Sequence, residues 1–251
     1  MARVQPKVWS VFERALSDGR TVHFQIEDVA EEMWSTVVEF MLGNYIREDV
    51  WWVTAGTACD EGAIQEYRVL LTSIVRQRMS IACFLTDGDG TGRTLVAVNM
   101  CLPQKKGHFV EHNPVRIFSF FILPPLTSIQ TPKTKAGLLS LRMFAEAMKE
   151  TSIYEKFGVE EYLMGAGLSV APEYRRLGIA TEMLKIRPKL AKDLGFRVTG
   201  GIFTGAAAQL SAEKADMECY YQINYKEFGK QCETTFETTT EYLKMYAKRV
   251  D

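Results

Sequence analysis

The stretch that decides the fold is residues 163–181, LMGAGLSVAPEYRRLGIAT. Residues 162–170 are apolar and small, as in a strand, whereas residues 179–194 carry the apolar spacing of an amphipathic helix. The turn between them holds Arg175, Arg176 and Gly178. The first N–H groups of a helix have no intrahelical partner and, with the helix dipole, bind anions, and a glycine lets the backbone approach them closely. The stretch therefore predicts a pyrophosphate site; the alternative is a solvated turn with two surface arginines.

The chain on either side of this stretch predicts one α/β domain spanning residues 1–251, because strand and helix patterns alternate without a linker or repeat. Asp28 and Glu31 form a capping box that predicts a helix through about Leu42, and Asp60 predicts a helix from Glu61 to about Met79. The other predicted helices cover 136–149 and 206–215, and residues 103–135 form a long excursion. The predicted strands cover 21–26, 80–86, 93–102, 162–170, 197–203, 218–228 and 239–247.

Composition excludes several classes of protein. With 30 basic and 31 acidic residues, the net charge of -1 gives no bulk attraction to nucleic acid or to an anionic membrane. The five cysteines form no CxxC pair and the three histidines are scattered, so we expect reduced thiols and no metal site. The amino-terminal residues lack an apolar signal core. We therefore expect a cytoplasmic protein, and a monomer.

The turn also carries a resemblance to a known family. Arg175-Arg176-Leu177-Gly178-Ile179-Ala180 matches the acetyl-CoA signature Q/R-x-x-G-x-G/A of the GNAT superfamily. Residues 168–175, 202–205, 212–215 and 243–245 resemble the insect arylalkylamine N-acetyltransferase-like branch. The resemblance is good from Tyr162 to the carboxyl end and weaker from Val8 to Leu102.

This resemblance implies a fold, a cosubstrate and a set of binding residues. The fold is a central mixed, twisted sheet with two splayed strands, flanked by helices. The cosubstrate is acetyl-CoA, and a small primary amine attacks its thioester directly. Leu168, Ser169 and Val170 would pair with the pantetheine arm, and Thr204 would line the opposite side of the cleft. The pyrophosphate would lie against Arg175, Arg176, Leu177, Gly178, Ile179, Ala180 and Thr181.

The reaction needs a base, because an alkylamine with a pKa near ~10 arrives protonated. The insect branch places Asp-Glu-Pro after its first helix, and the matching residues here are Glu48-Asp49-Val50. The resemblance therefore implies Glu48 or Asp49 as the base, and a surface acidic pair is the alternative. Trp51 and Trp52 beside them either line an amine pocket or pack in the core.

One departure from the family keeps other functions open. Relatives carry Ser-Ser-x-x-Ser where this chain has Thr204 to Ala208, so a single hydroxyl remains. The expected function is acetyl transfer, or transfer of a longer acyl group, to a small amine such as an arylalkylamine. The alternatives are a polyamine or agmatine acyltransferase, a degenerate member that binds CoA without turnover, and a different nucleotide-binding α/β protein. This sequence contains neither a P-loop nor a GxGxxG turn after a strand, which argues against the last alternative.

Overall fold

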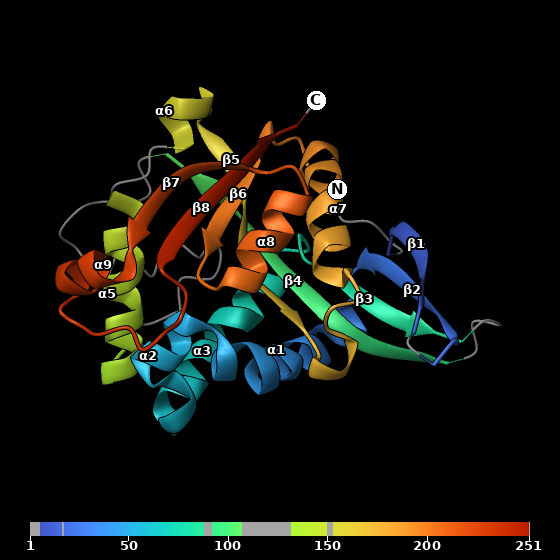
Figure 1. Ribbon diagram of the computed structural model, residues 1–251, viewed down its shortest axis with the longest axis horizontal. Helices are drawn as coiled ribbons and strands as arrows, with labels where there is room; N and C mark the ends of the chain where they lie inside the picture. The colour runs from blue at the N-terminus through green and yellow to red at the C-terminus, as the bar shows by residue number, and fades with distance from the viewer. Residues whose placement is uncertain (1–5, 17, 88–91, 107–131, 150–152, 251) are drawn as a thin grey trace.

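The computed structural model describes residues 6–16, 18–87, 92–106, 132–149 and 153–250. Its strands form one mixed sheet in the order β1-β2-β3-β4-β5-β6-β8-β7 (Figure 1). Neighbouring strands are antiparallel except β5 and β6, which are parallel. The strands are β1 (Val8–Ala15), β2 (Thr21–Asp28), β3 (Ile81–Thr86), β4 (Arg93–Lys105), β5 (Glu161–Val170), β6 (Val198–Phe203), β7 (Glu218–Asn224) and β8 (Tyr242–Arg249).

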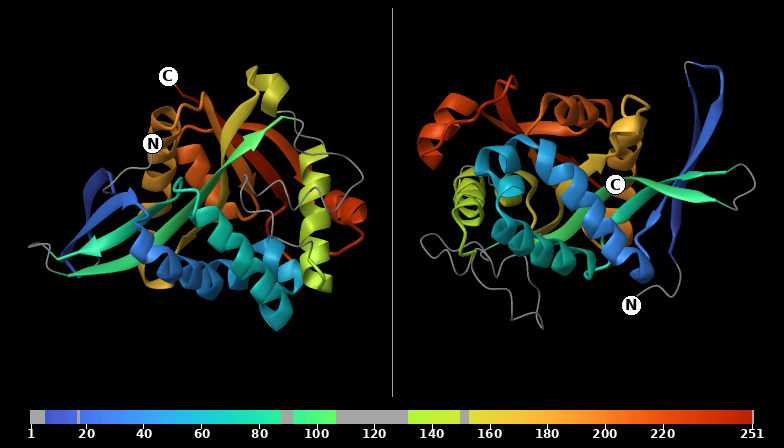
Figure 2. Two further views of the ribbon diagram at one scale, coloured as in Figure 1. Left: turned by 180° about the vertical axis from the view of Figure 1, so that it is seen from behind. Right: turned by 90° about the horizontal axis from the view of Figure 1, so that it is seen from below.

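Helices cover both faces of this sheet. Helices α7 and α8 pack on one face, and α1 and α3 pack on the other, as the two directions of view in Figures 1 and 2 show. The helices are α1 (Trp34–Glu48), α2 (Val50–Ala55), α3 (Glu61–Val75), α5 (Lys135–Lys149), α6 (Ile153–Phe157), α7 (Ile179–Asp193), α8 (Ala206–Lys214) and α9 (Tyr225–Cys232). No helix in these ranges combines the length and the apolar character needed to cross a bilayer.

Alternation along the strands explains the two layers. Successive residues of a strand point to opposite faces, so Leu163 packs toward α7 whereas Met164 packs toward α1, α3 and α5. The core on the α1 side is the larger and includes Met41, Leu71 and Met100. Each face of the sheet thus buries its own apolar cluster, which is the expected α/β packing.

The sheet opens between β5 and β6. Their parallel pairing joins Leu163 to Thr199, Met164 to Gly200 and Gly165 to Gly201. Beyond these pairs the two strands separate, although β5 continues to Val170 and β6 to Phe203. On the other edge of β5, Gly165 and Gly167 pair with consecutive residues of β4, so Ala166 forms a bulge. We call the Gly165–Gly201 pair the vertex of the splayed strands. The predicted splayed sheet is therefore confirmed.

The structure corrects the predicted elements at four places. Asp28 caps no helix, because its carboxylate accepts from Lys7 N and Trp9 Nε1; a 3-10 turn at Glu31–Met33 precedes α1, which runs on to Glu48. The helix after Asp60 ends at Val75. The sheet also contains β1, which precedes the strand expected to be first. Residues 225–228 are helical rather than extended, since Asn224 caps α9 by accepting from Lys226 N. Much of the 87–92 turn and of the 103–135 excursion lies outside the described residues.

Candidate active site

The turn after β5 has the geometry of an anion site. Gly178 lies at the start of α7 with φ +76°, a left-handed conformation that favours glycine, and no side chain caps the helix. Glu182 N is the first to bond back into the helix, to Gly178 O at 3.0 Å. The N–H groups of Ile179, Ala180 and Thr181 precede that bond, at the positive end of the helix dipole.

The predicted binding residues take different places around this turn. Ile179 packs its side chain in the core, so it offers only its backbone, whereas Arg175 and Arg176 are exposed. Arg176 has φ +63°. Leu168, Ser169 and Val170 pair with β4 on one edge, and beyond the vertex they have no pairing with β6 on the other. The structure thus brings a free strand edge next to an uncapped helix start.

Arg175 connects the turn to the predicted acidic pair. Its Nε donates to Val170 O at 3.1 Å, and its Nη2 forms an ion pair with Glu48. Both side chains of this pair are more than 40% exposed. Glu48 therefore points to the surface and joins the end of α1 to the end of β5.

Asp49 points the other way. It caps α2, with Oδ1 accepting from Trp51 N at 3.0 Å, and its Oδ2 accepts a short hydrogen bond from Thr204 Oγ1. Burial raises the pKa of Asp49 from 3.8 to about 6, against the opposing effect of the bonds from Thr204 and the α2 backbone. A carboxyl with this pKa is ionised at neutral pH and still basic enough to accept a proton.

Thr204 holds Asp49 in place and is itself fixed. Its side chain is buried, at the end of β6, and its carbonyl accepts from Tyr225 Oη at 2.7 Å. Burial, with the nearby Asp49 charge adding to it, raises the pKa of the Tyr225 phenol, so Tyr225 remains a donor. Three segments far apart in the chain, at residues 49, 204 and 225, therefore form one hydrogen-bonded chain.

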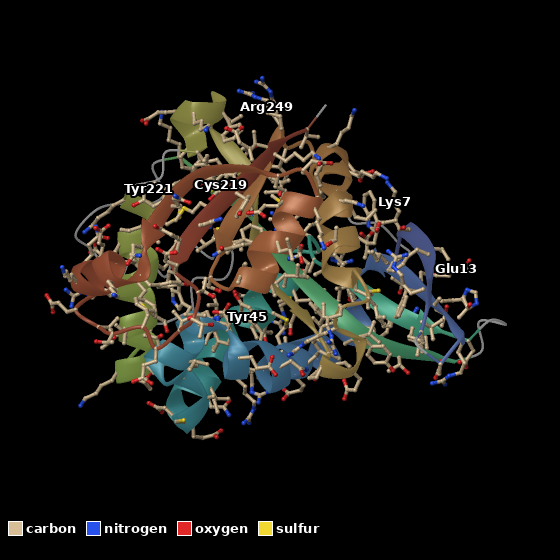
Figure 3. The ribbon with its side chains drawn as sticks, in the orientation of Figure 1. Lys7, Glu13, Tyr45, Cys219, Tyr221 and Arg249 are labelled. Atoms are coloured by element: carbon tan, nitrogen blue, oxygen red, sulfur yellow. The ribbon has the colours of Figure 1, made fainter. Side chains whose placement is uncertain are left out.

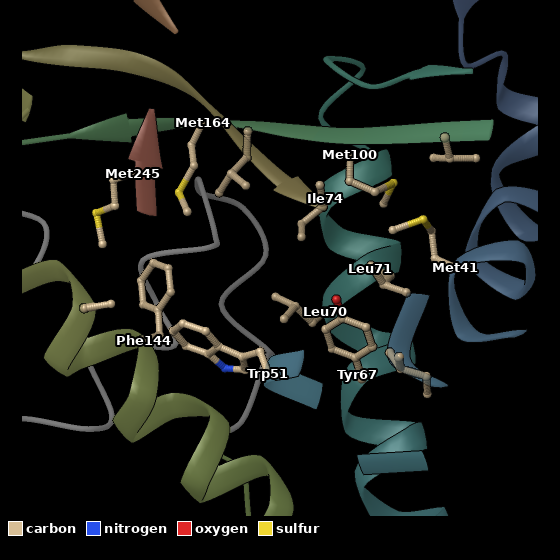
Figure 4. Packing of buried hydrophobic residues seen from close by; sticks show 14 of the residues in the cluster. Met41, Trp51, Tyr67, Leu70, Leu71, Ile74, Met100, Phe144, Met164 and Met245 are labelled. Atoms are coloured by element: carbon tan, nitrogen blue, oxygen red, sulfur yellow. The ribbon is translucent and has the colours of Figure 1, made fainter. Parts of the chain in front are cut away.

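An apolar cavity of about 110 Å³ lies beside this hydrogen-bonded chain and reaches the vertex. Trp51, Tyr67, Leu70, Phe144 and Met164 surround it from α2, α3, α5 and β5 (Figure 4). Tyr45 of α1, labelled in Figure 3, also lines it, as do Gly165, Gly167 and Thr204. Trp51 and Trp52 pack in the core, as one of the two predictions had it, and they also line this cavity.

Glu66 is the one carboxylate among the described residues that line the cavity. Its oxygens accept from Lys133 N, Thr134 N and Thr134 Oγ1 at 2.5, 3.1 and 2.6 Å. These three hydrogen bonds hold the Glu66 carboxylate against residues 133 and 134. Within the described part of the chain, no three His, Cys, Asp or Glu side chains gather as metal ligands.

Sequence reasoning missed two contributors to the site. Arg14, on the unpredicted β1, donates from Nε to Leu177 O at 2.9 Å and pairs with Glu182, the acidic residue in the first turn of α7. Tyr225 was assigned to a strand. The spacing of Tyr225, Phe228 and Cys232, all buried on one side of α9, is a helical signal that follows a capping asparagine.

Comparison with solved structures confirms the GNAT acetyltransferase fold. A candidate arylalkylamine N-acetyltransferase 7 of the yellow fever mosquito Aedes aegypti aligns with a TM-score of 0.82 and 23% identity, covering 98% of this chain and 96% of that one. Arylalkylamine N-acetyltransferase 2 of Aedes aegypti aligns with a TM-score of 0.68 and 16% identity, over 91% and 99% of the chains.

A third similar structure is that of an enzyme with a different amine acceptor. Drosophila melanogaster polyamine N-acetyltransferase, which forms N-acetylagmatine, aligns with a TM-score of 0.68 and 18% identity, covering 90% of this chain and 99% of that one. No protein-family model matches the sequence, and no curated protein matches it. At these identities the comparisons establish the fold and the expected resemblance to the insect acetyltransferases, and the chemistry rests on the site.

Proposed function

We propose that this protein is an acetyl-CoA-dependent N-acetyltransferase that acts on small primary amines with an aromatic body, and that residues 1–251 form its single domain. The observation that supports this most is the half-buried Asp49, bonded to Thr204 beside an apolar cavity at the vertex of two splayed strands. A carboxylate that lies beside a cavity and has a raised pKa is expected to take part in the chemistry of the site, unlike a solvated acid at the surface.

The residues around the vertex fit acetyl-CoA, which supplies the activated acyl thioester. The free edge of Leu168, Ser169 and Val170 offers backbone groups to an extended, amide-containing arm. The N–H groups of Ile179, Ala180 and Thr181 would hold the pyrophosphate. The side chains of Arg175 and Arg176 would lie around it, and the backbone of Leu177 and Gly178 would approach it closely. Ile202 on β6 and Thr204 just after that strand line the cavity and would face the arm from the opposite side.

Asp49 is the better base of the acidic pair. The ammonium gives its first proton to solvent, because only the neutral amine has a lone pair with which to attack. The Oδ2 of Asp49 accepts from Thr204 Oγ1, and the lone pairs of that hydroxyl remain free to accept the second proton from the amine nitrogen. A proton can therefore pass from the amine to Thr204 while the Thr204 proton passes to Asp49. The transfer becomes easier as the amine nitrogen bonds to carbon, because that bond makes its remaining protons more acidic. Glu48 forms an ion pair with Arg175 at the surface instead.

The cavity favours an aromatic amine over a polyamine. A second ammonium or guanidinium would need a carboxylate that can turn toward it, and the one carboxylate in the described lining, Glu66, is held by three hydrogen bonds from residues 133 and 134. An aromatic ring finds tryptophan, tyrosine and phenylalanine side chains in the lining. Burying such a ring contributes about 2–3 kcal/mol. We therefore expect tenfold or greater preference, about 1.4 kcal/mol or more, for aromatic amines.

Thiol release from acetyl-CoA, measured with tyramine, dopamine, serotonin, agmatine and spermidine, tests this function. We expect turnover with the aromatic amines and a kcat/KM at least about tenfold lower with agmatine and spermidine. The reverse order would favour the polyamine alternative. Saturable acetyl-CoA binding without turnover of any amine would indicate a degenerate member of the superfamily.

Thr204→Val tests the coupling between the hydroxyl and the base. The bond from Thr204 lowers the pKa of Asp49, so its loss should move the acidic limb of the kcat profile above pH 6. The proton path through the hydroxyl is lost as well, so kcat should fall. Thr204→Ser keeps the hydroxyl and should keep the wild-type pH profile. An unshifted limb in Thr204→Val would argue against the bond in solution.

A further inference from the structure

Arg187, in the middle of α7, is buried without a counter-charge. Its side chain is 2% exposed and its Nε has no hydrogen-bond partner. Nη2 reaches Met217 Sδ at 3.7 Å, and the guanidinium carbon lies 5.9 Å from the centre of the Phe203 ring, so its partners are a thioether and an aromatic face. Among the residues that the structure describes, no carboxylate forms an ion pair with it. Burial lowers the pKa of this guanidinium. A buried, uncompensated charge is strongly unfavourable, and an apolar side chain of similar size would be more stable there.

The guanidinium lies at the vertex of the splayed strands. Gly165 leaves the space that it occupies, because a side chain at Gly165 would collide with Arg187 Nη1. Asn99, fully buried on β4, faces the same glycine and has an unpartnered Oδ1, while its Nδ2 donates to Gly167 O at 2.9 Å. Two buried polar side chains with unsatisfied atoms thus flank the last paired residue of β5.

The position of Arg187 along α7 matches the place where the sulfur of a bound acetyl-CoA would lie. Arg187 is eight residues after Ile179, which is roughly 12 Å down the axis of α7 from the anion site. From Val170 to Gly165, β5 covers roughly 17 Å in the same direction. An extended arm with its phosphates at the start of α7 would therefore have its sulfur near the vertex.

We propose that Arg187 is a positioning charge of the acyl-transfer site, which stabilises negative charge on the sulfur of bound CoA. This inference rests on the proposed function. As the amine nitrogen bonds to the carbonyl carbon, the carbon–sulfur bond breaks and its electron pair stays on sulfur. The ammonium gives its first proton to solvent before attack, and the second proton goes to Asp49 through Thr204 as the carbon–nitrogen bond forms. The sulfur therefore leaves as a thiolate without a separate acid, and Arg187 supplies the counter-charge.

The experiment compares CoA with desulfo-CoA by calorimetry at pH 6.5 and 8.5. If Arg187 lowers the pKa of the bound thiol by one from an ordinary value of ~8.5, the preference for CoA over desulfo-CoA rises about fivefold across this range. Cys101 and Tyr162 also face Arg187, but burial raises the pKa of both, to about 12 for Cys101. Neither titrates in this range, and effects shared by the two ligands cancel in the ratio.

Arg187→Met should abolish the pH-dependent rise in this preference, keep the affinity for desulfo-CoA, and lower kcat by up to about tenfold. Lys189→Met removes one exposed charge from the same helix and should behave as wild type. If Arg187→Met fails to fold, Arg187→Gln removes the charge and keeps a polar group. Equal changes toward both ligands would show a structural role and overturn the inference. Absence of binding of either ligand by the wild type would overturn the proposed function as well.

Discussion

Asp49→Asn is expected to reduce kcat by about 10²–10⁴-fold, the usual contribution of a general base. The acidic limb that we expect in the wild-type kcat profile near pH 6 should disappear, because the carboxyl with that pKa is gone. The amide keeps an oxygen that can accept from Trp51 N, so the cap of α2 is retained. Initial rates of thiol release measured between pH 5 and 9 give both the fall in kcat and the loss of the acidic limb.

The same substitution should stabilise the protein at neutral and higher pH. The folded-state pKa of Asp49, about 6, exceeds the ordinary 3.8, so the unfolded chain releases this proton first. The free energy of unfolding of the wild type therefore falls between about pH 4 and 6 and stays lower above, by up to about 3 kcal/mol. Asn does not ionise, so Asp49→Asn should match the wild type at pH 4 and exceed it at pH 8. Urea unfolding at the two pH values measures the difference.

Glu48→Gln is the matched control. It removes a neighbouring carboxylate whose half-exposed ion pair with Arg175 is worth at most about 1 kcal/mol, so kcat/KM should change by no more than about fivefold. A loss in Glu48→Gln as large as that in Asp49→Asn would contradict the assignment of Asp49. So would an acidic limb that survives in Asp49→Asn.

Gly178→Ala should weaken acetyl-CoA binding at least about tenfold. The left-handed backbone of Gly178, φ +76°, costs roughly 1–2 kcal/mol with any ordinary side chain. Within the protein the added methyl would meet only Arg14, at 3.6 Å, and it would occupy open space directly before the helix start. It would hold the phosphates away from the helix start. Calorimetric titration with acetyl-CoA measures the loss.

Gly195→Ala separates binding from backbone strain. Gly195 follows the other end of α7 with φ +87°, and nothing lies within 4 Å of an added methyl group. Both variants should lose a similar free energy of unfolding, and only Gly178→Ala should lose affinity for acetyl-CoA. Equal affinities in the two variants would place the phosphates elsewhere.

The sequence predicts the central half of the fold well because its signals there are local. The strand before Gly178 and the helix after it follow from composition and spacing, and Asp60 caps α3 as expected. Asp28 misleads because a capping pattern does not show that its carboxylate accepts from Trp9 Nε1, on a strand brought alongside it. The strand β1 contains Val8, Trp9, Val11 and Phe12, but these residues do not alternate with polar ones and none is buried, so no strand periodicity marks it.

The site could be predicted only in part. The signature at Arg175–Ala180 and the acidic pair are visible in the sequence, but the choice between Glu48 and Asp49 is not. That choice depends on which way each side chain points: toward Arg175 at the surface, or toward Thr204, 155 residues away along the chain. Arg187 gives no signal either, since a lone arginine on an amphipathic helix is expected to face solvent.

Calorimetric titration of the wild-type protein with acetyl-CoA tests the central claim most directly, because every step proposed here begins with that molecule between β5 and β6. We predict saturable binding at one site per chain, competition by desulfo-CoA, and no comparable binding of ATP or NAD. Absence of binding, or tighter binding of ATP or NAD than of acetyl-CoA, would contradict the account.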